Sequence, residues 1–217
     1  MPDERTPLEI EETIRQHAPE MAGRIRKAAL AHPGDEANFR RPVEQAVEEF
    51  ARQVELRIEP RHEYTLLNGR ADSVYNRLVV EYEPPGSLRK DNSSRTNKHA
   101  IKQVAKYIEE LAVVERRRKA NRLAGVVLDG SWFIFVRFKD DRWQIDDPLP
   151  VEADSTERFL RYLNALSTEL AITPDNLIRD FGENKRISRG SVSRLYRALK
   201  TSNHRKVKVL FDQWSLQ

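Results

Sequence analysis

Apolar residues recur along the chain with two different periods, and these periods distinguish helices from strands. Spacing of three or four positions predicts helices over residues 36–56, 98–120 and 155–170. Residues 1–31 show the same spacing, but Pro19 interrupts it, so two helices are expected there rather than one. Asp154 or Ser155 is expected to cap the helix that follows it.

Short apolar stretches bounded by turn residues predict strands. They lie at residues 63–68, 71–75, 78–82, 123–128 and 132–138, with a short edge strand at 143–145. Asn68-Gly69 and Asp129-Gly130 are typical hairpin turns, and Asn76-Arg77 is a tight turn. The polar stretch 87–98 is expected to be a flexible loop. The order of the elements predicts an α/β fold with a mixed sheet flanked by helices.

Charge is distributed unevenly along the 217 residues, whose net charge is +4. Residues 185–208 contain nine Lys and Arg and no acid. Such a block predicts a phosphate backbone as partner, although a solvated helix face or a segment that docks on an acidic neighbour would have the same composition. We therefore expect a helical segment at 1–35, a core at 36–172 and a basic helical segment at 173–217.

Several classes of protein are excluded by what the sequence lacks. There is no cysteine, which rules out disulfides, thiolate zinc sites and cysteine nucleophiles. No signal peptide is recognised and no apolar stretch approaches the roughly 20 residues that span a bilayer, so we expect a cytoplasmic protein without a membrane partner. There is no glycine-rich loop of the kind that binds dinucleotides, nucleotide phosphates or S-adenosylmethionine, so no nucleotide cofactor is expected.

The chemistry of the central block is carried by two carboxylates. If the strands on either side of Asn76-Arg77 pair, Asp72 lies directly opposite Glu81, and directly opposed residues share a face of a sheet. Two such carboxylates repel each other unless a divalent cation lies between them, and the backbone carbonyl of Tyr82 would be a further ligand. The alternative is that each carboxylate forms an ion pair with a nearby arginine, such as Arg70 or Arg77.

Motifs in this region resemble the PD-(D/E)XK nuclease superfamily. They are Gly69-Arg70-Ala71-Asp72, Val79-Val80-Glu81-Tyr82-Glu83 and Gln103-x-x-x-Tyr107. The last resembles the RecB-like branch, and Glu-Tyr-Glu-Pro-Pro-Gly followed by His99-Ala100-Ile101-x-Gln103 resembles the N-terminal nuclease modules of restriction-type DNA methyltransferases. The resemblance covers residues 36–140 and implies a restriction-endonuclease-like mixed sheet. The end of the chain resembles the connector into a methyltransferase body.

The resemblance also implies roles for individual residues. Asp72 and Glu81 would hold Mg²⁺ or Mn²⁺, together with an acid of the preceding helix. For that acid Glu44 is favoured over Glu48 and Glu49, although an exposed helix glutamate is the alternative for each.

Two residues of the following helix have implied roles as well. Gln103 would contact the substrate backbone or the site carboxylates, and Tyr107 would stack or hydrogen-bond nearby. The alternative is an ordinary amphipathic helix with Tyr107 at the rim of the core.

Glu83 departs from the family pattern, which has a lysine at this position. A lysine from elsewhere would restore the positive charge, and Lys102, Lys98 and Lys90 are the candidates. Alternatively, Glu83 binds a second metal ion or acts as a base, or the domain binds DNA without cutting it.

We also expect a set of basic residues that contact DNA. They are Arg70, Arg89, Lys90, Lys98, Arg116, Arg117, Arg186, Arg189 and Arg194. The sequence thus predicts a Mg²⁺-dependent DNA endonuclease of a restriction or phage-defence system, as the nuclease module of a larger or multi-subunit enzyme with a methyltransferase domain or subunit. A catalytically inactive nuclease-fold module for DNA binding or assembly is the alternative.

Overall fold

The computed structural model describes residues 7–56, 58–66, 69–114, 123–166, 186–201 and 207–208. The chain divides into two compact units, Met1–Leu170 and Ala171–Gln217. The helices of the first unit are α1 (Pro7–Ala31), α2 (Glu36–Gln53), α3 (Arg95–Val114) and α4 (Ala153–Ala165). Its strands are β1 (Pro60–Leu66), β2 (Gly69–Tyr75), β3 (Leu78–Tyr82), β4 (Ala124–Leu128), β5 (Trp132–Lys139), β6 (Arg142–Ile145) and β7 (Leu149–Pro150).

The strands form one mixed sheet in the order β1-β2-β3-β4-β5-β6, with β7 paired to β5. Only β3 and β4 are parallel among the described strands, and α3 connects them. The other neighbours are antiparallel. A parallel pair needs a long crossover whereas antiparallel pairs need only short turns, so the predicted order of elements led to the correct mixed sheet.

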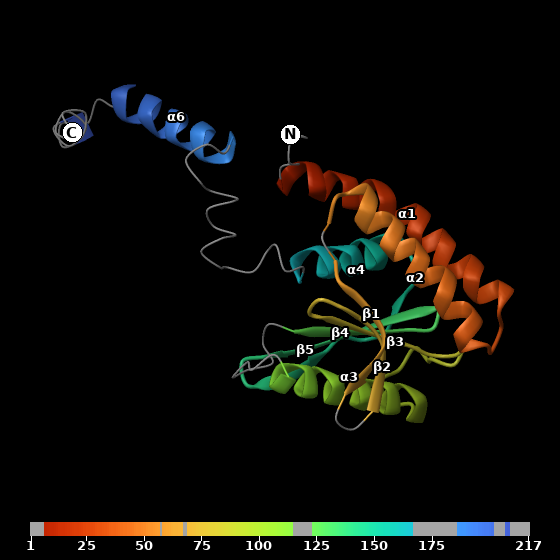
Figure 1. Ribbon diagram of the computed structural model, residues 1–217. Helices are drawn as coiled ribbons and strands as arrows, with labels where there is room; N and C mark the ends of the chain where they lie inside the picture. Colours follow the sequence, from red (N-terminus) through yellow and green to blue (C-terminus); the bar gives the residue numbers. More distant parts are fainter. Residues whose placement is uncertain are drawn as a thin grey trace. The chain divides into compact units, whose positions relative to one another are not determined.

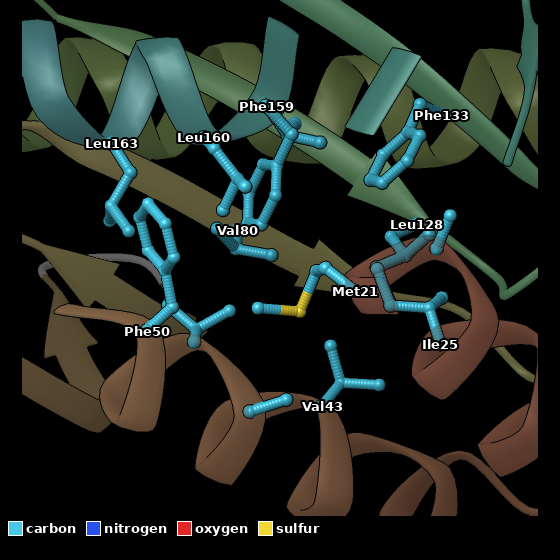
Figure 2. Close-up of a cluster of buried hydrophobic side chains, with 14 of the residues drawn as sticks. Met21, Ile25, Val43, Phe50, Val80, Leu128, Phe133, Phe159, Leu160 and Leu163 are labelled. Carbon is cyan, nitrogen blue, oxygen red and sulfur yellow. The ribbon is translucent and has the colours of Figure 1, made fainter. Parts of the chain in front are cut away.

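Helices cover both faces of this sheet (Figure 1). The helices α1, α2 and α4 share one hydrophobic core with the sheet, and α3 forms the second core on the other face. Figure 2 shows side chains of α1, α2 and α4 meeting those of the central strands in the first core. They include Met21, Ile25, Val43, Phe50, Val80, Leu128, Phe133, Phe159, Leu160 and Leu163. Helix α1 therefore belongs to the same compact unit as the sheet.

The prediction of two helices over residues 1–31 was wrong. The single helix α1 continues through Pro19. Ile14 and Ala18 before the proline and Ala22 and Ile25 after it are each at most 1% exposed. An internal proline costs a helix about 3 kcal/mol, and burial of one continuous apolar face on both sides of it offsets this cost.

The prediction for the cap of α4 was also wrong. Glu152 is the N-cap residue. Ser155 lies within the first turn, where its Oγ accepts a hydrogen bond from the Glu152 N–H at 3.1 Å. The Ser155 hydroxyl, within the helix, thus satisfies the backbone N–H of the N-cap residue.

The polar loop before α3 is attached to the core, in contrast to the flexible loop expected for residues 87–98. Leu88 is only 2% exposed, and its N–H donates to Asp129 Oδ2 at 2.9 Å. Asn97 in the first turn of α3 makes two hydrogen bonds with the backbone of Arg89. The loop therefore has fixed neighbours in both the β4–β5 turn and α3.

The second unit contains α6 (Arg186–Thr201). This helix lies within the region 173–217 that was expected to be a basic helical segment. Arg186, Arg189 and Arg194 lie within it, but their side chains are outside the described part of the structure. In the described part of the chain, no helix has the length and apolar character needed to cross a membrane.

Candidate functional site

The β2–β3 hairpin has the register that the turn at Asn76-Arg77 predicts. Tyr75 pairs with Leu78, Val74 with Val79, and Ser73 with Val80. One further step in this register places Asp72 opposite Glu81. Beyond the paired residues the strands are joined through a side chain, because the Tyr82 N–H donates to Asp72 Oδ2 at 2.8 Å.

Asp72 forms an ion pair with an arginine of helix α2. Its Oδ1 accepts a hydrogen bond from Arg40 Nη1 at 2.9 Å. The sequence had suggested Arg70 or Arg77 as the partner, but Arg70 pairs with Glu63 at 3.2 Å. The partner of Asp72 was missed because it lies 32 positions away along the chain, on an element whose docking no local pattern reveals.

Glu81 is 4% exposed and contacts α3. Its Oε1 accepts a hydrogen bond from Gln103 Nε2, which also donates to Tyr107 Oη at 3.1 Å. The three residues of the expected Glu81–Gln103–Tyr107 constellation thus come together. Gly69 makes room for them, because a Cβ at this position would lie 3.1 Å from Tyr107 Oη.

The second carboxylate oxygen of Glu81, Oε2, differs from Oε1 in its surroundings. Oε2 is buried and accepts no hydrogen bond within the part of the chain that the structure describes. A buried carboxylate oxygen without a partner is costly unless the group is protonated or bound to a cation. This atom is therefore the point at which the fold fits an added metal ion.

The acids around this atom disfavour ionisation of one another. Burial, followed by the charge of Asp72, raises the pKa of Glu81 to about 9. Burial, followed by the charge of Glu36, raises the pKa of Glu83 to about 7. Burial also raises the pKa of Asp72, although the Tyr82 N–H and Arg40 oppose the shift. A divalent cation would reverse these shifts because it stabilises the ionised carboxylates.

Glu44, the favoured acid of the preceding helix, belongs to a neighbouring polar network. Its Oε1 accepts a hydrogen bond from Ser73 Oγ at 2.5 Å and lies 3.0 Å from His62 Nδ1. Glu48 lies 2.8 Å from the other ring nitrogen, Nε2. Arg40, His62 and Ser73 were not singled out from the sequence, because single polar residues on one helix and two strands show no distinctive spacing.

The described residues contain no group of three acidic or histidine side chains arranged to hold a metal ion. This is compatible with Mg²⁺, which keeps several waters and binds through one or two carboxylates. Asp72 and Glu81 supply two carboxylates of this kind. Glu44 instead shares a polar network with Arg40, which contacts Asp72.

The candidate lysines lie in different surroundings from Gln103. Lys98 and Lys102 line a groove of about 610 Å³ together with Trp143 and Ile145 of β6. Gln103, one position further along α3, contacts Glu81 instead. Lys102 therefore faces the β6 side of the helix, and it is Arg40 that brings a positive charge to Asp72.

The remaining basic residues are spread around the loop and the edge of the sheet. Lys90 is exposed, as is Arg89, whose Nη1 donates to the Gly86 carbonyl at 2.8 Å. The Arg70 side chain is 62% exposed. Arg116 and Arg117 lie outside the described residues.

Comparison of the chain with family models, curated proteins and solved structures finds no match. The function is therefore inferred from the geometry of the site. Its distinguishing feature is a pair of neighbouring carboxylates at the end of a hairpin, one with a buried partnerless oxygen and the other with an arginine. Such a pair can bind a hard cation and, with it, an anionic substrate.

Proposed function

We propose that this chain is a Mg²⁺- or Mn²⁺-dependent nuclease module that hydrolyses phosphodiester bonds of DNA. The observation that supports the proposal most directly is the partnerless Oε2 of Glu81 beside Asp72. The order helix, three strands, helix, strand agrees with the fold that the motif resemblance implies. On the same resemblance, the module works in a restriction or phage-defence system, in the cytoplasm, with a methyltransferase domain or subunit.

Asp72 and Glu81 would hold the metal, with the backbone carbonyl of Tyr82 as a further ligand. A metal ion bound there would lower the pKa of a water molecule and neutralise charge on the phosphate. In the reaction the water oxygen forms a bond to phosphorus and the bond from phosphorus to the leaving oxygen breaks. In this scheme Glu83 would accept the proton of the water, and bulk water would supply the proton that the leaving oxygen takes up.

Gln103 and Tyr107 act as positioning residues in this scheme. The Gln103 amide fixes Oε1 of Glu81, which leaves Oε2 for the metal. The Tyr107 hydroxyl accepts a hydrogen bond from the same amide nitrogen and so restrains it. Side chains that are restrained in this way lose little freedom when a ligand binds.

A second function is a DNA-binding or assembly module without catalysis. It is favoured by Glu83, which stands where the motif has a lysine, and by the ion pair between Arg40 and Asp72. In this case Arg40 would serve only as a structural counter-ion for Asp72.

Plasmid cleavage in Mg²⁺ or Mn²⁺ distinguishes the two functions. We expect the wild-type chain to cut, and Asp72→Ala and Glu81→Ala to abolish cutting while circular dichroism shows that they fold. Glu20→Ala, which removes an exposed glutamate of α1, is the matched control and should cut normally. Binding of DNA without cutting in either metal ion would refute the nuclease and leave the second function.

A further inference from the structure

Arg40 is enclosed by acids from three elements. Its Nη1 lies 2.9 Å from Asp72 Oδ1 on β2, and its Nη2 lies 2.9 Å from Glu63 Oε1 on β1. Its Nε lies 3.5 Å from Glu44 Oε1, one turn further along α2. The side chain is mostly buried, with 14% of it exposed.

This arrangement fixes the guanidinium more firmly than a single surface ion pair would. An isolated exposed ion pair stabilises a protein by about 1 kcal/mol or less, so it holds its two long side chains only weakly in place. Here two planar N–H groups are directed at two different strands, so the position of the charge is set by the sheet itself. The guanidinium is ionised at every pH at which the protein is folded.

The site needs such a charge. Attack on a phosphodiester increases negative charge on the phosphate oxygens, and a fixed cation beside them lowers the barrier. Glu83 cannot provide it, and Lys102 faces the groove on the β6 side of α3. Arg40 is in direct contact with Asp72, one of the two proposed metal ligands.

We propose that Arg40 is a catalytic residue that supplies, from helix α2, the positive charge that Glu83 cannot supply on β3. The proposal rests on the proposed nuclease function. Arg40 has donors available for this role, because Nη1 and Nη2 carry two N–H groups each and the described contacts use one of each, to Asp72 and to Glu63. On substrate binding, the guanidinium keeps its contact with Asp72 and presents further N–H groups to a phosphate oxygen.

A purely structural ion pair would behave differently from a catalytic charge. Removing a structural partner would weaken the fold and, with it, both metal binding and cleavage. Removing a catalytic cation beside two carboxylates strengthens metal binding, because a competing positive charge is lost, while it slows the reaction. Tighter Mn²⁺ binding would show that the site is still folded, so a fall in kcat beside it would identify a catalytic charge.

The experiment compares wild type with Arg40→Met, Arg40→Lys and the control Arg24→Met. Arg24 also forms a partly exposed ion pair from a helix, with Glu49 at 2.6 Å. Three quantities are measured: the affinity for Mn²⁺ by calorimetry, kcat for plasmid cleavage and the midpoint of thermal unfolding. We expect Arg40→Met to bind Mn²⁺ more tightly and to lose about 100-fold in kcat, Arg40→Lys to regain part of kcat, and Arg24→Met to match wild type in both.

The outcomes separate this proposal from the proposed function. A wild-type chain that cuts no DNA in either metal ion overturns both. A wild-type chain that cuts, with Arg40→Met within twofold of its kcat, overturns only the role of Arg40. Parallel losses of Mn²⁺ affinity and kcat in Arg40→Met, without rescue by Arg40→Lys, also overturn that role and identify a structural ion pair.

Discussion

Replacing Glu81 by Gln should make the protein more stable in alkaline solution and flatten its dependence on pH. The folded state raises the pKa of Glu81 from the usual 4.5 to about 9. In the unfolded chain the carboxyl loses its proton near pH 4.5, whereas the folded chain retains it, so the unfolded state binds fewer protons over this range. The free energy of unfolding therefore falls as pH rises from 4.5 towards 9.

The size of the effect follows from linkage. One proton retained only by the folded state changes stability by about 1.4 kcal/mol per pH unit. Between pH 5 and pH 8, Glu81 alone thus accounts for up to about 4 kcal/mol, a large share of the 5–15 kcal/mol that stabilises a typical domain. Glu83 acts in the same direction up to its pKa of about 7. The acids whose pKa is lowered, such as Glu63 and Glu49, act with the opposite sign and only in acid.

Glutamine is the neutral isostere of the protonated side chain and can accept the same hydrogen bond from Gln103. Urea unfolding at pH 5, 6, 7 and 8 should show Glu81→Gln equal to wild type at pH 5 and more stable by up to about 4 kcal/mol at pH 8. Glu109→Gln, on the exposed side of α3, should follow wild type. Equal slopes for wild type and Glu81→Gln would refute the reasoning.

Metal binding adds a second readout to the same experiment. Because Mg²⁺ binds the ionised carboxylates, it should stabilise the wild-type protein more at pH 8 than at pH 6. Glu81→Gln should lose most of this stabilisation. A Mg²⁺ effect that is the same in both proteins would place the metal elsewhere.

Three further predictions concern packing, the loop and DNA. Gly125→Ala should cost about 1–3 kcal/mol of stability in urea unfolding, because its Cβ would overlap Val104 Cγ1, and unchanged stability would show that α3 can shift. Asp129→Ala should lower the free energy of unfolding by about 3 kcal/mol and speed proteolysis of the loop 87–98, because the buried carboxylate accepts hydrogen bonds from Leu88 and two other N–H groups. A rate of proteolysis equal to that of wild type would contradict this. Lys98→Ala should weaken DNA binding, measured by fluorescence anisotropy, and should reduce by about 1 the slope of log affinity against log salt concentration. An unchanged slope would show that the groove does not contact DNA.

The fold was largely predictable because its signals are local. The run Leu78–Tyr82 is apolar except for one acid, which is typical of a central strand buried on both faces, and β3 has these bounds. The tight turn before it fixed the register of β2 on β3 by arithmetic alone. The continuous helix through Pro19 was not predictable, since only tertiary burial of both halves offsets the local cost of the proline.

The candidate site was predictable only in part. The turn arithmetic brought Asp72 and Glu81 together, and the spacing of Gln103 and Tyr107 placed them on one side of α3. Helical geometry could also have excluded Lys102, because adjacent residues of a helix point about 100° apart. Arg40 could not be predicted, because its contact depends on how α2 docks against two strands.

The acids of the site and Arg40 have opposite effects on the pKa of Asp72. Arg40 opposes the rise in the pKa of Asp72, so removing it should raise that pKa further and make stability fall more steeply with pH. Arg40→Met should therefore steepen the pH dependence that Glu81→Gln flattens. In the Glu81→Gln background, Arg40→Met should steepen the slope less than it does in the wild-type background, because the loss of one acid removes part of the repulsion that Arg40 relieves. Urea unfolding of the four proteins between pH 5 and pH 8 measures this coupling, and strictly additive slopes would show that Arg40 and Glu81 do not share one site.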